Sequence, residues 1–375
     1  MFNLSNYAMN QEKSKGRLNE EKFDDSRSRF ERDRDRIIHS EAFRKLEYKT
    51  QVFVNHEGDY YRTRLTHTME VSQIARAIGK RLGLNLELIE AIALSHDLGH
   101  TPFGHTGEDV LDEILDDIGG FEHNRQSYRV VTYLEKRYPE FRGLNLSYET
   151  LEGIVKHATP YDHPSNEDLD DIFNLEEVPS LEAQIIDFAD EIAYLNHDID
   201  DGLVSNLLDW EELKNIDIWN ERLKKIKQKY KDCKNKNIVK FRTISSLISY
   251  FINDIINTTK NNIENYNIET FEDIKRKNKK IVGFSSKVDE NRRQLKEFLF
   301  EKMYNHPRVM RMRVSAERCI KELYKAYRKY PRIMPVKYQN EIDDIGLDRT
   351  IGDYISSMTD RFALEEYRSL YSGGI

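Results

Sequence analysis

Apolar residues along this chain recur mostly at intervals of three and four, and only rarely in strict alternation with polar ones. Intervals of three and four place side chains on one face of a helix, whereas alternation is typical of strands. Glycine and proline, which interrupt helices, contribute only 17 and 8 of the 375 residues. The pattern therefore predicts an all-α fold.

The helix predicted from about 66 to 82 carries an apolar stripe that steps by three or four residues from Val71 to Leu82. His67 lies four residues before Val71 and therefore at the end of the same face. A single histidine on an apolar face is more often a packed core residue than a metal ligand. His67 becomes a candidate ligand only together with other side chains.

The helix predicted from about 86 to 97 has His96 and Asp97 in its last turn, and a glycine and a proline shortly afterwards are expected to end it. The loop that follows adds His100 and His105. Imidazole and carboxylate ligands together suit Mn, Fe, Ni, Zn or, less well, Mg. Such crowding at a helix end indicates a metal site.

The helix predicted from about 181 to 201 is expected to begin after Ser180 as its N-cap and to end at Gly202. Acidic and aromatic residues share one sector of this helix with apolar neighbours, and buried carboxylates need a partner such as a cation. Spacing alone does not choose between Asp187 and Asp190 as the ligand. The sector contains Asp187, Asp190, Tyr194, His197 and Asp198.

The predicted helices fall into three regions of different composition. Residues 1–30 are polar and are expected to form an N-terminal arm. Glycine, histidine and proline concentrate in residues 31–205, which we interpret as the catalytic core. Residues 206–375 are expected to form a C-terminal helical region packed on that core, and its first part, to about residue 300, is Lys-, Asn- and Ile-rich scaffold.

Charge and composition narrow the function classes. The net charge of −8 argues against a protein that coats nucleic acid, although the basic residues clustered from Arg32 to Arg64 indicate either an anionic ligand or solvated helix faces. Two cysteines are too few for a disulfide framework or a cysteine-rich zinc site, so any metal would be bound by His and Asp or Glu. No apolar run approaches the roughly 20 residues of a membrane span, and the polar N-terminus is unlike a signal peptide. We therefore expect a cytoplasmic protein.

A histidine, a His-Asp pair and a distant aspartate, each at the core edge of a separate predicted helix, give the order H…HD…D. This order resembles the HD phosphohydrolase superfamily and, more specifically, the dGTPase-like branch of the deoxynucleoside triphosphate triphosphohydrolases. The resemblance covers most of the chain and is densest from 33 to 201. Its motifs are DRDRIIHSEAFRKLEYKTQVF (33–53), RTRLTHTMEV (62–71), LSHDLGHTPFGHTGE (94–108), GFEHNRQS (120–127), QIIDFADEIAYLNHDIDD (184–201), YNHPRVMRM (304–312) and MTDRFALEEY (358–367).

The resemblance implies an HD-domain helical core and a metal held by His67, His96, Asp97 and Asp190, because the residues four and eight positions after Asp190 then match the family's sugar contacts. Mn²⁺ or Mg²⁺ is expected first, with Ni²⁺, Fe²⁺, Co²⁺ and Zn²⁺ as further candidates. Two neutral imidazoles and two carboxylates leave a divalent ion formally neutral with open positions, where it can acidify a water and coordinate phosphate oxygens.

The family reaction is attack at the α-phosphorus of a deoxynucleoside triphosphate (dNTP), which releases deoxynucleoside and intact tripolyphosphate. The leaving 5′-oxygen needs a proton, for which His105 is the candidate acid, with Glu108 three residues later to orient its imidazole. His123 maps to the same active-site neighbourhood.

The resemblance also implies substrate contacts. Arg64 matches the family's phosphate-binding arginine, and Lys156 is a weaker candidate for the same role. Gln51 and Asp198 resemble the pair that contacts the 3′-hydroxyl, and Tyr194 resembles the ring that lies against the 2′ carbon. A 2′-hydroxyl would clash with that ring, which predicts selectivity for deoxyribose.

A homo-oligomer, with a hexamer among the expected forms, and regulation by allosteric nucleotides are further implications of the resemblance. Two alternatives stay open, and so does the base preference. Another HD-type nucleotidase or phosphodiesterase would use the same ligands on a different nucleotide. A nucleotide-responsive regulatory protein would keep the pocket and bind single-stranded nucleic acid through its basic patches.

Overall fold

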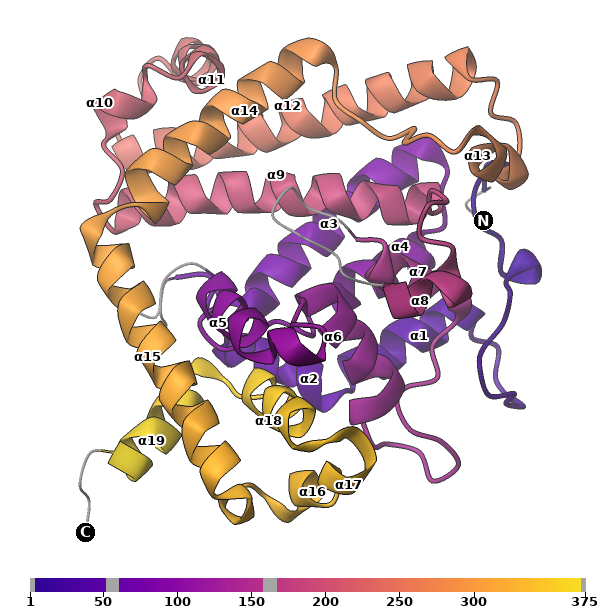
Figure 1. Ribbon diagram of the computed structural model, residues 1–375. Helices are drawn as coiled ribbons and strands as arrows, with labels where there is room; N and C mark the ends of the chain where they lie inside the picture. Colours follow the sequence, from indigo (N-terminus) through magenta and orange to yellow (C-terminus); the bar gives the residue numbers. More distant parts are fainter. Residues whose placement is uncertain (1–3, 52–60, 158–166, 372–375) are drawn as a thin grey trace. The chain divides into compact units, whose positions relative to one another are not determined.

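The computed structural model describes residues 4–51, 61–157 and 167–371, which form an all-α fold (Figure 1). Among these residues β pairing is confined to isolated bridges, such as the one between Thr50 and Thr63. The expected fold class is therefore confirmed. None of the helices in the described ranges combines the length and the apolar character that a membrane span requires.

The helices, with short 3₁₀ and π turns labelled η, are in chain order η1 (Gln11–Lys13), α1 (Arg29–Ile38), α2 (Glu41–Lys45), η2 (Leu46–Tyr48), α3 (Arg64–Leu82), α4 (Leu86–Ser95), α5 (His105–Leu115), η4 (Asp116–Ile118), α6 (His123–Arg129), η5 (Val130–Leu134), α7 (Tyr148–Val155), α8 (Glu167–Phe173), α9 (Leu181–Val204), α10 (Trp210–Leu213), α11 (Asp217–Lys229), α12 (Lys236–Asn265), α13 (Phe271–Lys277), α14 (Ser286–Leu299), η6 (Phe300–Tyr304), α15 (Pro307–Lys329), η7 (Pro331–Ile333), α16 (Val336–Gln339), α17 (Ile342–Ile345), α18 (Leu347–Ser356) and α19 (Asp360–Tyr371).

Serine side chains define the start of several helices. Ser28 and Glu31 form a capping box at α1, in which each side chain accepts a hydrogen bond from the other residue's backbone N–H. The Ser180 hydroxyl accepts from the Ala183 N–H at 3.3 Å, which confirms the expected N-cap of α9. Each cap satisfies a backbone donor that the first helical turn leaves without an intrahelical partner.

The end of α9 differs from the expectation. The helix continues through Gly202 to Val204, and Ser205 is its C-cap. The Gly202 carbonyl accepts hydrogen bonds from Leu207 and Leu208 at 2.9 and 3.0 Å, and a Cβ on Gly202 would lie 2.6 Å from the Leu208 side chain. The expectation that Gly202 ends the helix is wrong, because this glycine provides space for the chain that folds back onto the helix.

The chain divides into two compact units, and the division falls within α3 and α4. Residues 4–30, expected to be an arm, contribute to both units. The boundaries predicted at residues 30 and 205 stay predictions. Unit 1 contains Met1–Lys13, Met69–Ala93 and Glu176–Met310, and unit 2 contains Ser14–Thr68, Leu94–Leu175 and Arg311–Ile375.

Unit 1 is organised around α9, which runs beside α12 and also contacts α14 (Figure 1). Glu182, in the first turn of α9, accepts hydrogen bonds from the N–H groups of Met9 at 2.9 Å and Asn85 at 3.1 Å. The Gln184 side-chain oxygen accepts from the Ile281 N–H at 2.8 Å. These buried bonds attach the N-terminal segment, the start of α4 and the segment before α14 to one helix.

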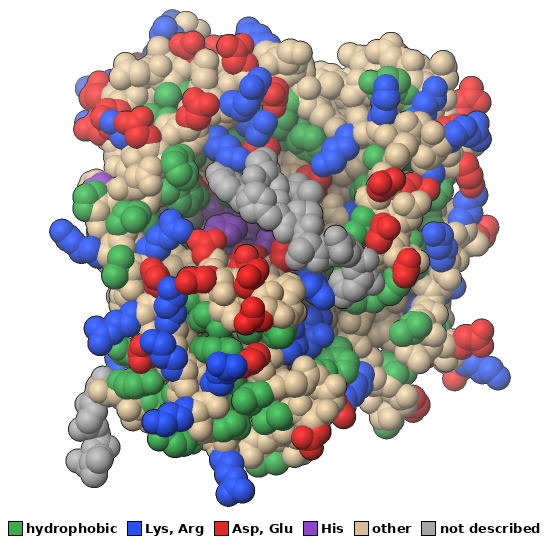
Figure 2. Space-filling view, in the orientation of Figure 1, with side chains coloured by type: hydrophobic (Ala, Val, Ile, Leu, Met, Phe, Trp, Pro, Cys, Tyr) green, Lys and Arg blue, Asp and Glu red, His purple; other side chains and the backbone are tan. Residues whose placement is uncertain are grey.

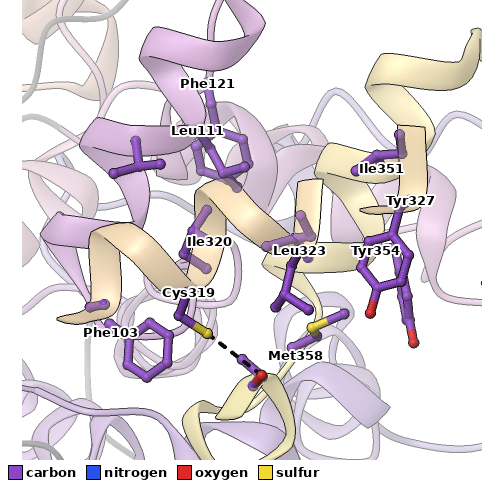
Figure 3. Packing of buried hydrophobic residues seen from close by; sticks show 14 of the residues in the cluster. Phe103, Leu111, Phe121, Cys319, Ile320, Leu323, Tyr327, Ile351, Tyr354 and Met358 are labelled. Carbon is purple, nitrogen blue, oxygen red and sulfur yellow. Dashed lines mark hydrogen bonds between the residues drawn. The ribbon is translucent and has the colours of Figure 1, made fainter. Parts of the chain in front are cut away.

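Unit 2 contains an apolar core between α5, α15, α18 and α19 (Figure 3). Phe103, from the loop before α5, packs into this core. Cys319 on α15 donates a weak hydrogen bond to the Ala363 carbonyl on α19 at 3.6 Å, and burial raises the pKa of the Cys319 thiol to about 12. Other members are Leu111, Phe121, Ile320, Leu323, Tyr327, Ile351, Tyr354 and Met358.

The basic residues near α1 form ion pairs within unit 2. Arg32 pairs with Asp25 and Arg36 pairs with Glu21, each at 2.7 Å. On the face shown in Figure 2, basic and acidic side chains are interspersed. These two arginines therefore fasten the segment before α1, and they do not form an open cationic patch.

Candidate metal centre and active site

The His96-Asp97 pair lies in a tight turn directly after α4, which ends two residues earlier than the spacing predicts. Ser127 on α6 holds this turn, because its hydroxyl donates to the His96 carbonyl and accepts from the Gly99 N–H, both at 2.8 Å. A Cβ on Gly99 would lie 2.2 Å from the Ser127 backbone nitrogen. Glycine at this position therefore allows the turn to approach α6 closely.

Asp97 is the centre of a buried cluster in unit 2. Its Oδ2 lies 3.7 Å from His67 Nε2 and 3.0 Å from Arg64 Nη1. Its Oδ1 lies 3.5 Å from His96 Nε2 and 3.0 Å from His100 Nε2. Within unit 2 the structure thus brings together His67, His96 and Asp97 with Arg64, the predicted phosphate-binding arginine.

The surroundings of Asp97 keep its carboxylate ionised. Burial alone would raise the pKa of Asp97, but the positive charges of His96 and Arg64 outweigh burial and hold that pKa well below its usual value. Burial, with the charges of Arg64 and His123, lowers the pKa of His100 well below its usual value. Asp97 is therefore an ionised acceptor, and His100 is a neutral imidazole that donates to it.

Glu108 is the centre of a second group, which lies on α5 and α6 and in the turn before them. The Glu108 Oε1 lies 2.8 Å from His123 Nδ1, and the Oε2 lies 3.5 Å from His105 Nδ1 and 3.7 Å from His100 Nδ1. The rings of His100 and His123 are stacked with their centroids 4.1 Å apart. Ligand atoms of His100, Glu108 and His123 lie within 4.8 Å of one another, so this group could also hold a metal.

His105 is the accessible member of this second group. Its side chain is 57% exposed, whereas those of His100 and His123 are buried. Burial would raise the pKa of Glu108, but the charge of His123 and the hydrogen bonds from His105 and His123 hold that pKa well below its usual value. An ionised Glu108 can therefore orient an imidazole that solvent or a substrate reaches.

The remaining predicted residues of unit 2 differ in their availability. The Arg64 guanidinium is buried, and only its Nη1 bonds to Asp97. Gln51 is half-buried, and its side-chain oxygen has no hydrogen-bond partner within the described part of the chain. The Lys156 ammonium is buried in an ion pair with Glu152 at 2.9 Å, so binding a phosphate would require it to leave that carboxylate.

The other predicted residues lie on α9 in unit 1. Asp190 is buried, whereas Asp187 is half-buried and pairs with Lys280 at 3.0 Å. The Tyr194 hydroxyl donates to Glu191 at 3.3 Å. Asp187 thus has an ion-pair partner at the surface, and the choice of Asp190 as the ligand on this helix stays a prediction.

Asp198, also on α9, has a neighbour that the spacing of residues did not predict. The Tyr304 hydroxyl, more than a hundred residues later in the chain, donates a short hydrogen bond to Asp198 Oδ2, and His197 Nδ1 lies 2.9 Å from its Oδ1. Tyr304 is the first residue of the motif YNHPRVMRM, and membership in that motif is the one feature of the sequence that marks it as a candidate site residue. The hydrogen bond from Tyr304 orients the buried Asp198 carboxylate.

Comparison with known proteins places this geometry in a family. Residues 64–195 match the HD domain, and residues 282–369 match the phosphohydrolase-associated domain. A deoxyguanosinetriphosphate triphosphohydrolase-like protein of Geobacter sulfurreducens is 55% identical over 368 residues, which cover 98% of this chain and 95% of the relative. A protein with the same description from Thiobacillus denitrificans is 46% identical over 366 residues, with 98% and 96% covered. The chain belongs to the HD-domain family that includes these deoxyguanosinetriphosphate triphosphohydrolase-like proteins.

In this chain, the HD domain match begins at Arg64 and includes every member of the H…HD…D order. The phosphohydrolase-associated match includes α15, α18 and most of α19, whose side chains form the core of Figure 3 with α5. The family resemblance expected from the motifs is therefore confirmed.

Proposed function

We propose that this protein hydrolyses deoxynucleoside triphosphates to deoxynucleoside and tripolyphosphate in a reaction that depends on a divalent ion. The observation that carries the proposal is the arrangement of His67, His96 and Asp97 beside the pair formed by Glu108 and His105. Membership in a family whose relatives are described as deoxyguanosinetriphosphate triphosphohydrolase-like supports it.

The donor set fits a divalent ion. The two distances from the Asp97 oxygens to the ring nitrogens of His67 and His96 are 3.7 and 3.5 Å, which are too long for good hydrogen bonds. Two ligands that each lie about 2.1 Å from one ion are roughly 3.0–3.4 Å apart, close to these values. We propose that these three residues and Asp190 hold Mn²⁺ or Mg²⁺, or another divalent transition metal. When bound, such an ion would acidify a water and polarise a phosphoryl oxygen.

His105 is proposed to supply the proton to the leaving 5′-oxygen. Its imidazole is exposed, and Glu108 lies beside its Nδ1, which leaves Nε2 for the substrate. His123 is proposed to act through Glu108, because it occupies the other carboxylate oxygen.

Arg64 is proposed to bind a phosphate of the substrate. Its Nη1 forms an ion pair with Asp97. Its Nη2 lies near Gly104, where a side chain would come within 3.4 Å of it, and its Nε forms no hydrogen bond to any described residue. A buried guanidinium with remaining donors suits a triphosphate, which brings about four negative charges into an acidic protein.

The proposed deoxyribose contacts are Gln51 and Asp198 at the 3′-hydroxyl and Tyr194 against the 2′ carbon. Asp198 is an acceptor candidate that the Tyr304 hydroxyl already orients, and Gln51 offers a side-chain oxygen that no described residue satisfies. Rejection of ribonucleotides by the Tyr194 ring would be steric, because an added 2′-hydroxyl has no space.

Product analysis tests the proposal. The purified protein is incubated with each dNTP and each ribonucleotide in Mn²⁺ or Mg²⁺, and the phosphate products are resolved by chromatography. Tripolyphosphate and deoxynucleoside are expected. Orthophosphate or a nucleoside monophosphate would indicate another HD-type phosphohydrolase, and tight nucleotide binding without turnover would indicate a regulatory protein.

A further inference from the structure

The motif MTDRFALEEY has no role in the chemistry proposed above, although its aspartate is one of the most buried carboxylates of unit 2. Asp360 is the first residue of α19, and its residue surface is 1% exposed. Its Oδ2 accepts hydrogen bonds from the Thr50 N–H, at 2.9 Å, and from the Thr50 hydroxyl. Its Oδ1 accepts from the Phe103 N–H at 2.9 Å. One buried carboxylate thus joins three segments that are far apart in the sequence.

Both partners of Asp360 adjoin residues of the candidate site. Thr50 directly precedes Gln51 and forms the isolated bridge with Thr63, the residue before Arg64. Phe103 precedes His105 by two residues. A shift of the Asp360 carboxylate would therefore move Gln51, the proposed 3′-hydroxyl contact, and His105, the proposed acid.

The backbone at Phe103 needs support from outside its own loop. Its φ of 64° lies in the left-handed region, which residues with a Cβ rarely adopt. Two contacts hold it there: the N–H bond to Asp360, and the packing of its ring into the core beside Cys319 (Figure 3). Both contacts come from the C-terminal part of the chain.

A buried lysine side chain reinforces the same connection. The Lys49 Nζ donates to the Ser356 carbonyl at 2.8 Å and to the His100 carbonyl. Lys49 therefore links the end of α18 to the turn that carries Asp97, while Asp360 links the start of α19 to Phe103.

We infer that Asp360 is a positioning residue, which sets Gln51 and His105 from the C-terminal helix α19. The inference rests on the proposed function for its kinetic readout, but its structural readout is independent of activity. The end of α18, through Lys49, and the start of α19, through Asp360, thus position residues of the candidate site without contacting the substrate.

Asp360→Asn is the main test, because it keeps the size of the side chain but turns one acceptor into a donor that faces N–H and O–H groups. We expect kcat/KM for the preferred dNTP to fall roughly 10- to 100-fold, as a small misplacement of reacting groups does. The preference for a dNTP over its 2′,3′-dideoxy analogue should also narrow. Hydrogen exchange should become faster in peptides that contain residues 98–107.

Tyr327→Phe is the matched control. It removes the 2.9 Å hydrogen bond from Tyr327 on α15 to Glu366 on α19. This bond, like those of Asp360, fastens α19, but it does not involve residues 98–107. A smaller loss of stability is expected, with unchanged hydrogen exchange in 98–107 and an unchanged preference for a dNTP over its 2′,3′-dideoxy analogue. Thr50→Val removes only one donor to Asp360, so it should change the preference for a dNTP over its dideoxy analogue less than Asp360→Asn does. Thr50→Val replaces Asp360→Asn as the test variant if Asp360→Asn does not fold.

The outcomes separate the inference from the proposed function. A wild-type protein that hydrolyses no dNTP refutes the proposed function, while the exchange comparison still decides the role of Asp360. Unchanged exchange in 98–107 in Asp360→Asn, or an equal effect of Tyr327→Phe on exchange and on the dideoxy ratio, overturns the inference.

Discussion

Glu108 accepts two hydrogen bonds from His123 through the same oxygen, one from the backbone N–H and one from the ring Nδ1, each at 2.8 Å. Its other oxygen lies 3.5 Å from His105 Nδ1. His123 therefore fixes the carboxylate from one side, and the free side of the carboxylate is directed at the one exposed imidazole in this group.

His105→Ala should separate proton delivery from metal binding. Turnover of dNTP is expected to fall by roughly 10²–10⁴-fold, while the bound ion and dNTP affinity are retained, because His105 is not among the proposed ligands. Single-turnover kinetics, metal analysis and a binding assay measure the three quantities. Loss of the ion together with activity would instead make His105 a ligand or a structural residue.

Changing both His96 and Asp97 to alanine should abolish bound metal and hydrolysis while helical content, measured by circular dichroism, stays nearly unchanged. Two of the four proposed ligands are then missing, and the turn that carries them is still held by Ser127. Full activity of this variant, or of wild-type protein freed of metal by a chelator, would rule out the assigned centre.

A matched pair of variants tests the ligand on α9. Asp190→Asn should lower the metal content, whereas Asp187→Asn should leave it unchanged, because Asp187 pairs with Lys280 at the surface. The metal content of both purified proteins, dialysed against the same buffered ion, provides the comparison. An equal loss in the two variants would contradict the choice of Asp190.

Sugar selectivity should depend on Tyr194. The wild-type protein is expected to hydrolyse dNTPs well ahead of the matching ribonucleotides, and Tyr194→Ala should narrow that difference at some cost in rate, because the sugar is then less well positioned. Ratios of kcat/KM measure the effect. An unchanged ratio in Tyr194→Ala would refute the deoxyribose pocket even if the metal centre is correct.

Asp198→Ala should weaken substrates that carry a 3′-hydroxyl and affect 2′,3′-dideoxy analogues much less. Tyr304→Phe serves as a milder companion variant, since it removes the hydroxyl that orients the carboxylate but leaves the carboxylate in place. Equal losses for both kinds of substrate in Asp198→Ala would place Asp198 in a structural role.

Glu341 should contribute stability that depends on pH. Burial raises its pKa, but hydrogen bonds from Lys136, Arg142 and Tyr133 outweigh burial and lower the pKa from 4.5 to about 2. The folded pKa lies below the ordinary value, so the contribution is present above about pH 4.5 and is lost as the pH falls towards 2. Glu341→Gln should lower the free energy of unfolding at pH 7 by about 1 kcal/mol, since both cations are partly solvated.

Urea denaturation of wild type and Glu341→Gln between pH 7 and pH 3 checks this expectation. The difference between the two proteins should shrink towards the acidic end. Asp344→Asn is the control, because Asp344 is exposed and lies 3.8 Å from Arg142. A difference that grows on acidification would have the wrong sign for a carboxylate with a lowered pKa.

Local features of this protein could be predicted from its sequence because they depend on neighbouring residues. Helical spacing gave the all-α class, and Ser180 marked the start of α9. Gly202 was misjudged because a glycine in sequence does not reveal whether it ends a helix or makes space for a partner, here Leu208.

The contacts that organise the candidate site join residues too far apart in the sequence for spacing to pair them. Asp360 meets Phe103 across 257 residues, and Tyr304 meets Asp198 across 106. Both Asp360 and Tyr304 lie in motifs that the sequence displays, but a motif does not say which segment its side chain will meet. Only the folded chain provides that pairing.

Because Cys319 is buried in the core of unit 2, chemical labelling of its thiol reports when that core unfolds. Because burial raises the pKa of this thiol to about 12, Cys319 stays protonated at pH 8, so a maleimide should label the half-buried Cys233 first. A second label can be added only when the core between α15 and α19 opens. Counting labels by intact-mass spectrometry after brief pulses would therefore time the opening of unit 2 in the unmodified sequence.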